Sequence, residues 1–243
     1  MNTAPAFLFT DFRRARDLIR QAILAKVRYL LLTGESGTGK TTLMSCLREL
    51  LDRCLFRIVY LHFASLNGYG LVRVLARHLR VPTRRSPPET VQAIAAVLAE
   101  EACLTLLWID EADLLPDDTF AELRALAEND LGGATKLCVL LAGMPCLRDR
   151  LQAPHLFPFW RRLQCRVEIT GLRAEEAKPF AVHHLGAKNA SRIPDEALAL
   201  LFDKSRGVPG LFVSYLDRVL AEQPKGPISV DTAKAILQQW DLA

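Results

Sequence analysis

The sequence lacks the features that mark membrane, secreted and zinc-binding proteins. No window approaches the ~20 uninterrupted apolar residues that a membrane span needs. Basic residues follow the short apolar patch at the N-terminus, the reverse of the order in a signal peptide. None of the six cysteines belongs to a CxxC pair, and none of the five histidines shows ligand spacing. We therefore expect a cytoplasmic protein with no membrane partner, whose cysteines are small buried apolar residues.

The chain also has little charge of either sign in excess, and it contains no internal repeat or low-complexity tract. Its 243 residues are 50% hydrophobic and 24% charged, the balance of a globular protein with a substantial core. The net charge of +4 permits a nucleic-acid partner without requiring one. This length suits one large domain, or a medium domain followed by a small one.

Short apolar runs alternate with amphipathic stretches as far as residue 170, the pattern of a parallel sheet covered by helices. The predicted strands are 29–33, 56–62, 104–109, 137–142 and 166–169. The predicted helices are one that follows Asp11 as N-cap, then 41–52, 71–79, 90–101, 117–128, 173–185, 195–204, 210–221 and 231–240. Gly132-Gly133 is predicted to break the regular structure between elements. We predict an α/β domain over 1–170 and a helical domain over 171–243.

A glycine-rich loop between the first strand and the next helix fits GxxxxGK[ST] without a mismatch. Its glycines let backbone N–H groups face an anion, and the following helix directs its positive dipole end at the same point. Lys40 can reach the outer phosphates of a nucleotide, and the Thr41 hydroxyl can bind Mg²⁺. The alternative is a turn that binds nothing. The predicted nucleotide site consists of Gly34, Glu35, Ser36, Gly37, Thr38, Gly39, Lys40, Thr41 and Thr42.

Two adjacent carboxylates end the third apolar run, in the stretch LTLLWIDEADLL. At the carboxyl edge of a parallel sheet they would face the phosphate loop. Asp110 would hold Mg²⁺ through water, and Glu111 would polarise the attacking water as general base. The alternative is an acidic helix start, because Asp110, Glu111 and Asp113 all suit a helix N-terminus.

With these stretches the chain resembles the AAA+ P-loop ATPases of the ExeA, TniB and TnsC group, relatives of the origin-recognition ATPases. The stretches that carry the resemblance are LLTGESGTGKTTL, LLWIDEADLL, VLLAGMPCLRDRL, FWRRLQCRVEITGL and SRGVPGLFVSYLDRVL. It implies a P-loop NTPase fold with a five-stranded parallel sheet of order 5-1-4-3-2 between helices, followed by a small all-α lid. It also implies ATP and Mg²⁺ as ligands.

The resemblance further implies an arginine finger, Arg162 or its neighbour Arg161, that reaches a second subunit's γ-phosphate in an ATP-dependent homo-oligomer. An exposed basic pair without that role is the alternative. Two positions depart from the group. Met144 stands where relatives often carry a polar sensor, and Gly210 stands where they often carry a lid arginine. Arg206 is a candidate substitute for that arginine.

Basic residues at helical spacing, Arg73, Arg77 and Arg80, suit the phosphates of double-stranded DNA, while a solvated helix face is the alternative. Phe7, Phe9 and Phe12 are either core residues or an adenine platform. The main functional hypothesis is a DNA-associated ATPase that regulates transposition and works with a transposase. Two alternatives remain open: an ExeA-like ATPase of a secretion or envelope system, and a nucleotide-gated switch with little turnover.

Overall fold

The computed structural model describes residues 6–62, 67–128 and 136–240 of the chain. Its contacts group them into two compact units. The first, here called the sheet unit, comprises Ala15–Gly34 and Leu43–Glu168. The second, here called the helical unit, comprises residues up to Arg14, the loop Glu35–Thr42 and everything from Ile169 onward. The predicted break at Gly132-Gly133 lies outside the described residues.

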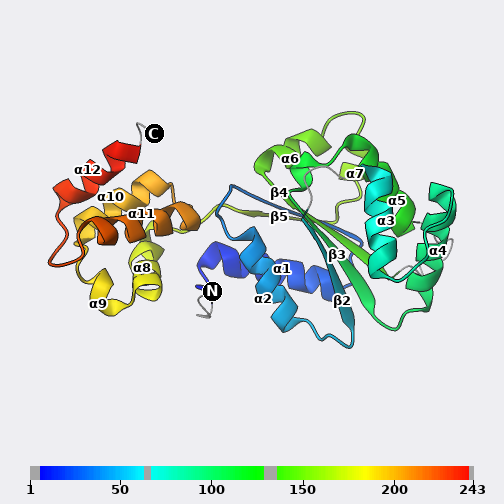
Figure 1. Ribbon diagram of the computed structural model, residues 1–243, viewed down its shortest axis with the longest axis horizontal. Coiled ribbons are helices and arrows are strands. Elements are labelled where there is room, and N and C mark those ends of the chain that lie inside the picture. The colour runs from blue at the N-terminus through cyan, green and yellow to red at the C-terminus, as the bar shows by residue number, and fades with distance from the viewer. Residues whose placement is uncertain (1–5, 63–66, 129–135, 241–243) are drawn as a thin grey trace. The chain divides into compact units, whose positions relative to one another are not determined.

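A five-stranded parallel sheet forms the centre of the sheet unit (Figure 1). Its order is β2-β3-β4-β1-β5, which confirms the predicted order read from the opposite edge. The apolar runs become strands because every residue of β1, β3 and β4 is buried, as a sheet covered on both faces requires. The strands are β1 (Tyr29–Gly34), β2 (Phe56–His62), β3 (Leu104–Asp110), β4 (Leu137–Gly143) and β5 (Cys165–Ile169).

Helices cover both faces of this sheet (Figure 1). Alternate strand residues such as Leu31, Leu107 and Val139 share one hydrophobic cluster with the helices on one face. Figure 1 shows α1 and α2 on the opposite side from α3 and α5. The helices that begin before β5 are α1 (Thr10–Leu24), α2 (Lys40–Leu50), α3 (Gly68–His78), α4 (Pro87–Glu100), η1 (Ala112–Leu114), α5 (Asp117–Glu128), α6 (Pro145–Leu151) and α7 (Phe157–Trp160).

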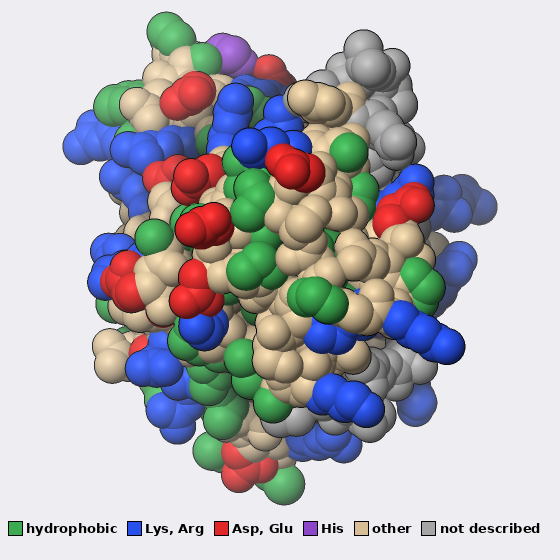
Figure 2. Space-filling model, turned by 90° about the vertical axis from the view of Figure 1, so that its left-hand side faces the viewer, with side chains coloured by type: hydrophobic (Ala, Val, Ile, Leu, Met, Phe, Trp, Pro, Cys, Tyr) green, Lys and Arg blue, Asp and Glu red, His purple; other side chains and the backbone are tan. Residues whose placement is uncertain are grey.

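After β5 the described chain forms helices alone. They are η2 (Ala174–Glu176), α8 (Ala177–Leu185), α9 (Ala187–Ala190), α10 (Asp195–Ser205), α11 (Pro209–Glu222) and α12 (Val230–Trp240). Basic, acidic and hydrophobic side chains are interspersed over the face that Figure 2 shows. The N-terminal aromatic residues belong to this unit's core, since Phe9 and Phe12 are buried and the ring of Phe7 packs on Phe180 of α8.

Two local predictions were wrong. Asp11 is not the N-cap of α1, which begins at Thr10; its carboxylate instead accepts hydrogen bonds from the amide and hydroxyl of Thr170, with the amide at 2.6 Å. The cysteines are not generally buried. Cys138 is buried, whereas Cys54 and Cys146 are exposed. Among the described residues, no helix combines the length and apolar character that crossing a bilayer demands.

Candidate nucleotide-binding site

The phosphate loop leaves the buried end of β1 and turns directly into α2. Gly37 and Gly39 have φ angles of +82° and +101°, in the region that glycine adopts at no steric cost. A Cβ atom at Gly39 would lie 3.4 Å from the ring of Phe12, so the aromatic ring presses against the loop backbone. Thr38 is buried, while Glu35, Ser36, Thr41 and Thr42 are exposed. The loop thus has the backbone that an anion-binding nest needs.

Within the loop, the carbonyl oxygen of Glu35 accepts three hydrogen bonds. The donors are the Thr38 hydroxyl at 2.8 Å, the Lys40 ammonium at 3.0 Å and the Thr38 amide at 3.3 Å. A carbonyl oxygen has two lone pairs, so three donors crowd it, and the hydrogen bond from the Thr38 amide is the longest of the three. A phosphate oxygen could take over the ammonium and this amide with little cost to the loop.

Asp110 ends β3 as a buried carboxylate, only 4% exposed. The Tyr60 hydroxyl donates to its Oδ2 at 2.8 Å, and the Glu111 amide donates to its Oδ1 at 3.0 Å. Burial raises the pKa of Tyr60 above its usual value, and the bond to Asp110 and the charges of both acids raise it further. Tyr60 therefore keeps its proton and holds the carboxylate in one orientation.

Glu111 differs from Asp110 in both backbone and exposure. Its φ and ψ are 51° and 37°, a left-handed conformation uncommon for residues other than glycine, asparagine and aspartate. Its side chain is 47% exposed, and His62 Nε2 lies 3.8 Å from its Oε2. Glu111 makes no capping hydrogen bond to η1, and the Oδ1 of Asp113 accepts from the Met144 amide instead. A short helix does begin here, as the alternative of an acidic helix start expects, but the Glu111 side chain does not cap it.

The sheet register puts the ends of β1 and β3 on one edge of the sheet unit. Leu31 and Ile109 both pair with Leu141 of β4, so Asp110 lies one residue beyond this level and Gly34 three residues beyond it. One strand, β4, lies between β1 and β3, so the axes of these two strands are about 10 Å apart. The phosphate loop follows directly on Gly34, although the loop itself is part of the helical unit.

The two positions that depart from the group, Met144 and Gly210, lie directly after β4 and in the first turn of α11. Met144 is a partly exposed residue directly after Gly143, the last residue of β4, and its thioether donates no hydrogen bond. Arg206 is exposed and left-handed, with φ at 51°. Gly210 lies in the first turn of α11, and its amide donates to the Gly37 carbonyl at 2.9 Å.

The arginine pair lies at the amino edge of the sheet, where it lines a hollow of about 410 Å³ with Lys26, Arg28 and Gln164. Arg162 donates from Nε to Glu128 and from Nη1 to the Pro158 carbonyl, both at 2.6 Å. Arg161 is exposed. Strand length places this edge roughly 20 Å from the carboxyl edge that holds Asp110. Neither arginine can therefore serve the acidic pair of its own chain.

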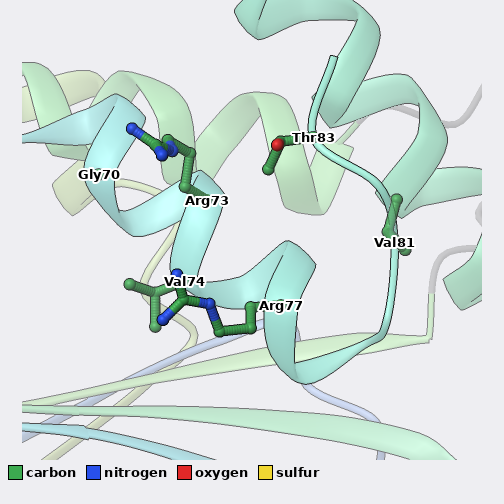
Figure 3. A pocket seen from close by; sticks show the side chains of 6 residues that line it. All are labelled: Gly70, Arg73, Val74, Arg77, Val81 and Thr83. Atoms are coloured by element: carbon green, nitrogen blue, oxygen red, sulfur yellow. The ribbon is translucent and has the colours of Figure 1, made fainter.

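The predicted basic stripe is only partly helical. Arg73 and Arg77 lie on α3, but α3 ends at His78 and Arg80 follows in a left-handed turn with φ at 58°. Figure 3 shows both α3 guanidinium groups directed toward the start of the helix, beside a pocket that faces Thr83. The pocket has a volume of about 420 Å³ and is lined by Gly70, Arg73, Val74, Arg77, Val81 and Thr83, with no acidic residue among them.

Sequence reasoning missed two residues that shape these sites, Tyr60 and Arg150, and it named Asp113 only as part of the acidic helix start. Tyr60 reaches Asp110 because β2 pairs with β3. Arg150 of α6 donates to the Asp113 carbonyl at 2.8 Å and to the Asp117 carboxylate at 3.0 Å, which ties α6 to the segment after β3. The position of Asp113, three residues after Asp110, was the one feature of the sequence that could have pointed to this cluster of hydrogen bonds.

Comparison with known proteins gives the family. Residues 26–151, just over half of the chain, match the AAA domain family. The chain belongs to this family. The match covers the phosphate loop, the acidic pair and Met144. It confirms the AAA part of the predicted resemblance. The TniB and TnsC part stays a prediction.

A curated relative of this chain supports the ExeA part of the predicted resemblance. General secretion pathway protein A of Aeromonas hydrophila is 26% identical over 201 residues, which cover 79% of this chain and 36% of that protein. This chain therefore spans only about a third of the length of that relative.

Solved structures share the fold at low identity. The ORC2 protein of Aeropyrum pernix, in ADPNP–ADP complexes, has a TM-score of 0.69 at 15% identity and covers 98% of this chain and 70% of its own. Cdc6p of Pyrobaculum aerophilum has a TM-score of 0.67 at 20% identity, with 93% and 66% covered. The ORC1 protein of A. pernix, in complex with DNA, has a TM-score of 0.63 at 18% identity, with 93% and 64% covered.

Proposed function

We propose that this AAA domain binds ATP with Mg²⁺ and hydrolyses it. The observation that carries the proposal is the placement of Gly34 and buried Asp110 at one sheet edge, with a loop of left-handed glycines following Gly34. The loop Gly34–Thr42 binds the phosphates, and Lys40 moves from the Glu35 carbonyl to them. Thr41 and Asp110 would hold the Mg²⁺, which would supply neutralisation of the phosphate charge.

In this proposal Glu111 is the general base that polarises the attacking water, because its carboxylate is exposed and makes no cap. Changing Glu111→Gln should lower kcat for ATP hydrolysis by at least about 100-fold and leave the Kd for ATP within about threefold. Steady-state phosphate release and titration with a fluorescent ATP analogue measure the two quantities. Glu89→Gln, at an exposed acid on α4, is the matched control. Undiminished hydrolysis by the Glu111 variant would contradict the assignment.

We further propose that the chain is a cytoplasmic, DNA-associated regulator of transposition that assembles on double-stranded DNA in its ATP state and works with a transposase. The pocket beside α3 offers two guanidinium groups and no acid, which suits backbone phosphates. The fold neighbour ORC1 is itself recorded in complex with DNA.

Filter binding of duplex DNA at several salt concentrations, with and without ATP, tests the proposal. Arg73→Ala with Arg77→Ala should weaken binding and reduce the slope of log K against log salt by nearly 2. Arg48→Ala, at an exposed arginine of α2, is the control. Binding that neither ATP nor salt affects would remove the DNA role.

Two specific observations favour other functions. The match to general secretion pathway protein A over 79% of this chain favours an ATPase of a secretion or envelope system. Co-purification with a membrane complex, with no affinity for DNA, would support that alternative. Met144 and Gly210 provide no polar sensor side chain, which favours a nucleotide-gated switch with little turnover. A wild-type turnover no faster than that of the Glu111 variant would support the switch.

A further inference from the structure

Three segments of the helical unit come close to one another at glycine positions. Gly171 follows β5, Gly207 and Gly210 flank the turn into α11, and Gly37 lies at the tip of the phosphate loop. The Leu172 amide donates to the Gly207 carbonyl at 2.8 Å. A Cβ atom at Gly171 would lie 2.3 Å from that same carbonyl oxygen, and one at Gly207 would lie 2.6 Å from the Leu172 oxygen. No side chain fits at either position without a backbone shift.

The contact between α11 and the phosphate loop is also close, although less so. The Gly210 amide donates to the Gly37 carbonyl at 2.9 Å. A Cβ atom at Gly210 would lie 3.0 Å from Gly37 Cα and 3.2 Å from Gly37 O. The first amides of a helix have no partner within the helix, and Pro209 at the start of α11 has no N–H at all. The Gly210 amide is therefore the first one that α11 can offer, and it goes to the loop.

This hydrogen bond fixes one peptide plane of the loop. A trans peptide is planar, so the Gly37 carbonyl and the Thr38 N–H point in opposite directions. With the carbonyl held toward α11, the Thr38 amide is directed into the loop, where its present bond to Glu35 is long at 3.3 Å. That amide is one of the donors that a bound phosphate would use.

We propose that Gly210 is a positioning residue for the phosphate loop, acting as a backbone latch between the helical unit and the nucleotide. It occupies the place where the resemblance predicts a lid arginine. An arginine would begin with a Cβ atom within 3.2 Å of the loop backbone. In this chain the lid is thus coupled to nucleotide through a main-chain hydrogen bond rather than through a guanidinium group. The inference rests on the proposed binding of ATP.

The test compares the wild-type chain with Gly210→Ala and with Leu211→Ala. Leu211 is the next residue of α11 and is exposed, so its variant is the matched control. Fluorescent ADP and ATP analogues give Kd values, and hydrogen exchange of 209–216 with and without nucleotide reports the response of α11. Thermal unfolding without nucleotide checks the fold, which alanine should preserve because it suits a helix better than glycine does.

We expect Gly210→Ala to raise both Kd values at least about 10-fold, to remove most of the nucleotide-dependent protection of α11, and to leave the Tm without nucleotide nearly unchanged. Leu211→Ala should stay within about twofold of wild type. If Gly210→Ala does not fold, Val208→Ala is measured in its place. It removes a methyl group that lies 3.4 Å from where a Cβ atom on Gly37 would stand, and it should raise Kd by at least about threefold.

Wild-type affinity and protection in Gly210→Ala, or an equal loss in Leu211→Ala, would overturn the latch. So would wild-type affinity in Val208→Ala, should that variant be the one measured. A wild-type chain that binds no nucleotide would instead overturn the proposed function itself, and the two failures are thereby distinguished.

Discussion

Two neighbouring acids in this protein have been given opposite surroundings by the backbone between them. Asp110 is still in the strand, buried and held by two hydrogen bonds, whereas Glu111 is left-handed and accessible. A left-handed residue with a Cβ atom costs roughly 1–2 kcal/mol, and glycine would fit the backbone at less cost. The position therefore keeps a glutamate against the local preference, which is the pattern expected where the carboxylate serves a function.

At the same scale, the buried hydroxyl of Tyr29 leads us to expect that the protein loses stability in alkali. Burial raises the pKa of Tyr29 above its usual value near 10, and Glu128, which accepts from its hydroxyl at 3.1 Å, raises it further. Above about pH 10 the unfolded chain releases this proton and the folded chain keeps it, so the free energy of unfolding falls by up to about 1.4 kcal/mol per pH unit.

Tyr29→Phe should remove this part of the pH slope, as measured by urea unfolding at pH 9, 10 and 11. Tyr69→Phe is the control, because the Tyr69 hydroxyl lies at the surface and bonds a loop carbonyl. An unchanged slope in Tyr29→Phe would show that its hydroxyl ionises normally in the fold.

At the scale of elements, the sequence predicted what repeats over several turns or strand residues. Buried runs such as 137–142 and amphipathic stretches such as 117–128 were placed within two residues of β4 and α5. Helices α6 and α7 were missed, because seven and four residues that include prolines show too little helical period. Tyr60 was missed because its contact with Asp110 depends on strand pairing across 50 positions. The domain boundary at 170 and the site residues remain proposals.

The contact that Arg150 makes between α6 and the segment after β3 should contribute measurably to the free energy of unfolding. Arg150 of α6 bonds the carbonyls of Asp113 and Leu115 and the carboxylate of Asp117, and it stacks on Phe120 at 5.6 Å. Arg150→Ala should lower the free energy of unfolding by about 2 kcal/mol, because it leaves these acceptors without their cationic donor. Urea unfolding measures the change.

Arg148→Ala, on the exposed side of α6, is the control for Arg150→Ala. The hydrogen bond from Arg150 lowers the pKa of Asp117, and His155 lowers it further. This contribution to stability is therefore present above about pH 4 and declines as the pH falls further. If Arg150→Ala lowers the free energy of unfolding no more than Arg148→Ala does, the Arg150 hydrogen bonds do not stabilise the fold as proposed.

At the scale of the whole molecule, the arginine pair and the acidic pair occupy opposite edges of one sheet. We expect the site to be completed by a second copy, with Arg162, or its exposed neighbour Arg161, reaching the second copy's nucleotide. The bond of Arg162 to Glu128 holds its guanidinium in place, whereas Arg161 is free to extend. Each subunit would then be incomplete as an ATPase.

Arg162→Ala should lower kcat at least about 10-fold while the Kd for nucleotide stays within about threefold, since the residue acts on another subunit's site. Arg161→Ala is the paired comparison. Adding Glu111→Gln chains, whose own sites are inactive, should restore part of the turnover of Arg162→Ala chains. Wild-type kcat in both arginine variants would contradict a shared site, and so would a lowered kcat that the Glu111→Gln chains do not restore.

The strand order also determines how long β1 lacks a pairing partner during synthesis. Strand β1 borders only β4 and β5, and its first residue, Tyr29, pairs with Val139, more than 100 positions later. At 5–20 residues per second, β1 waits roughly 5–20 s of translation for a neighbour. A nascent chain halted before Leu137 would carry YLLLTG as an unpaired apolar segment, open to chaperones and aggregation. The phosphate loop, which follows β1, is thus synthesised well before the strand that β1 pairs with.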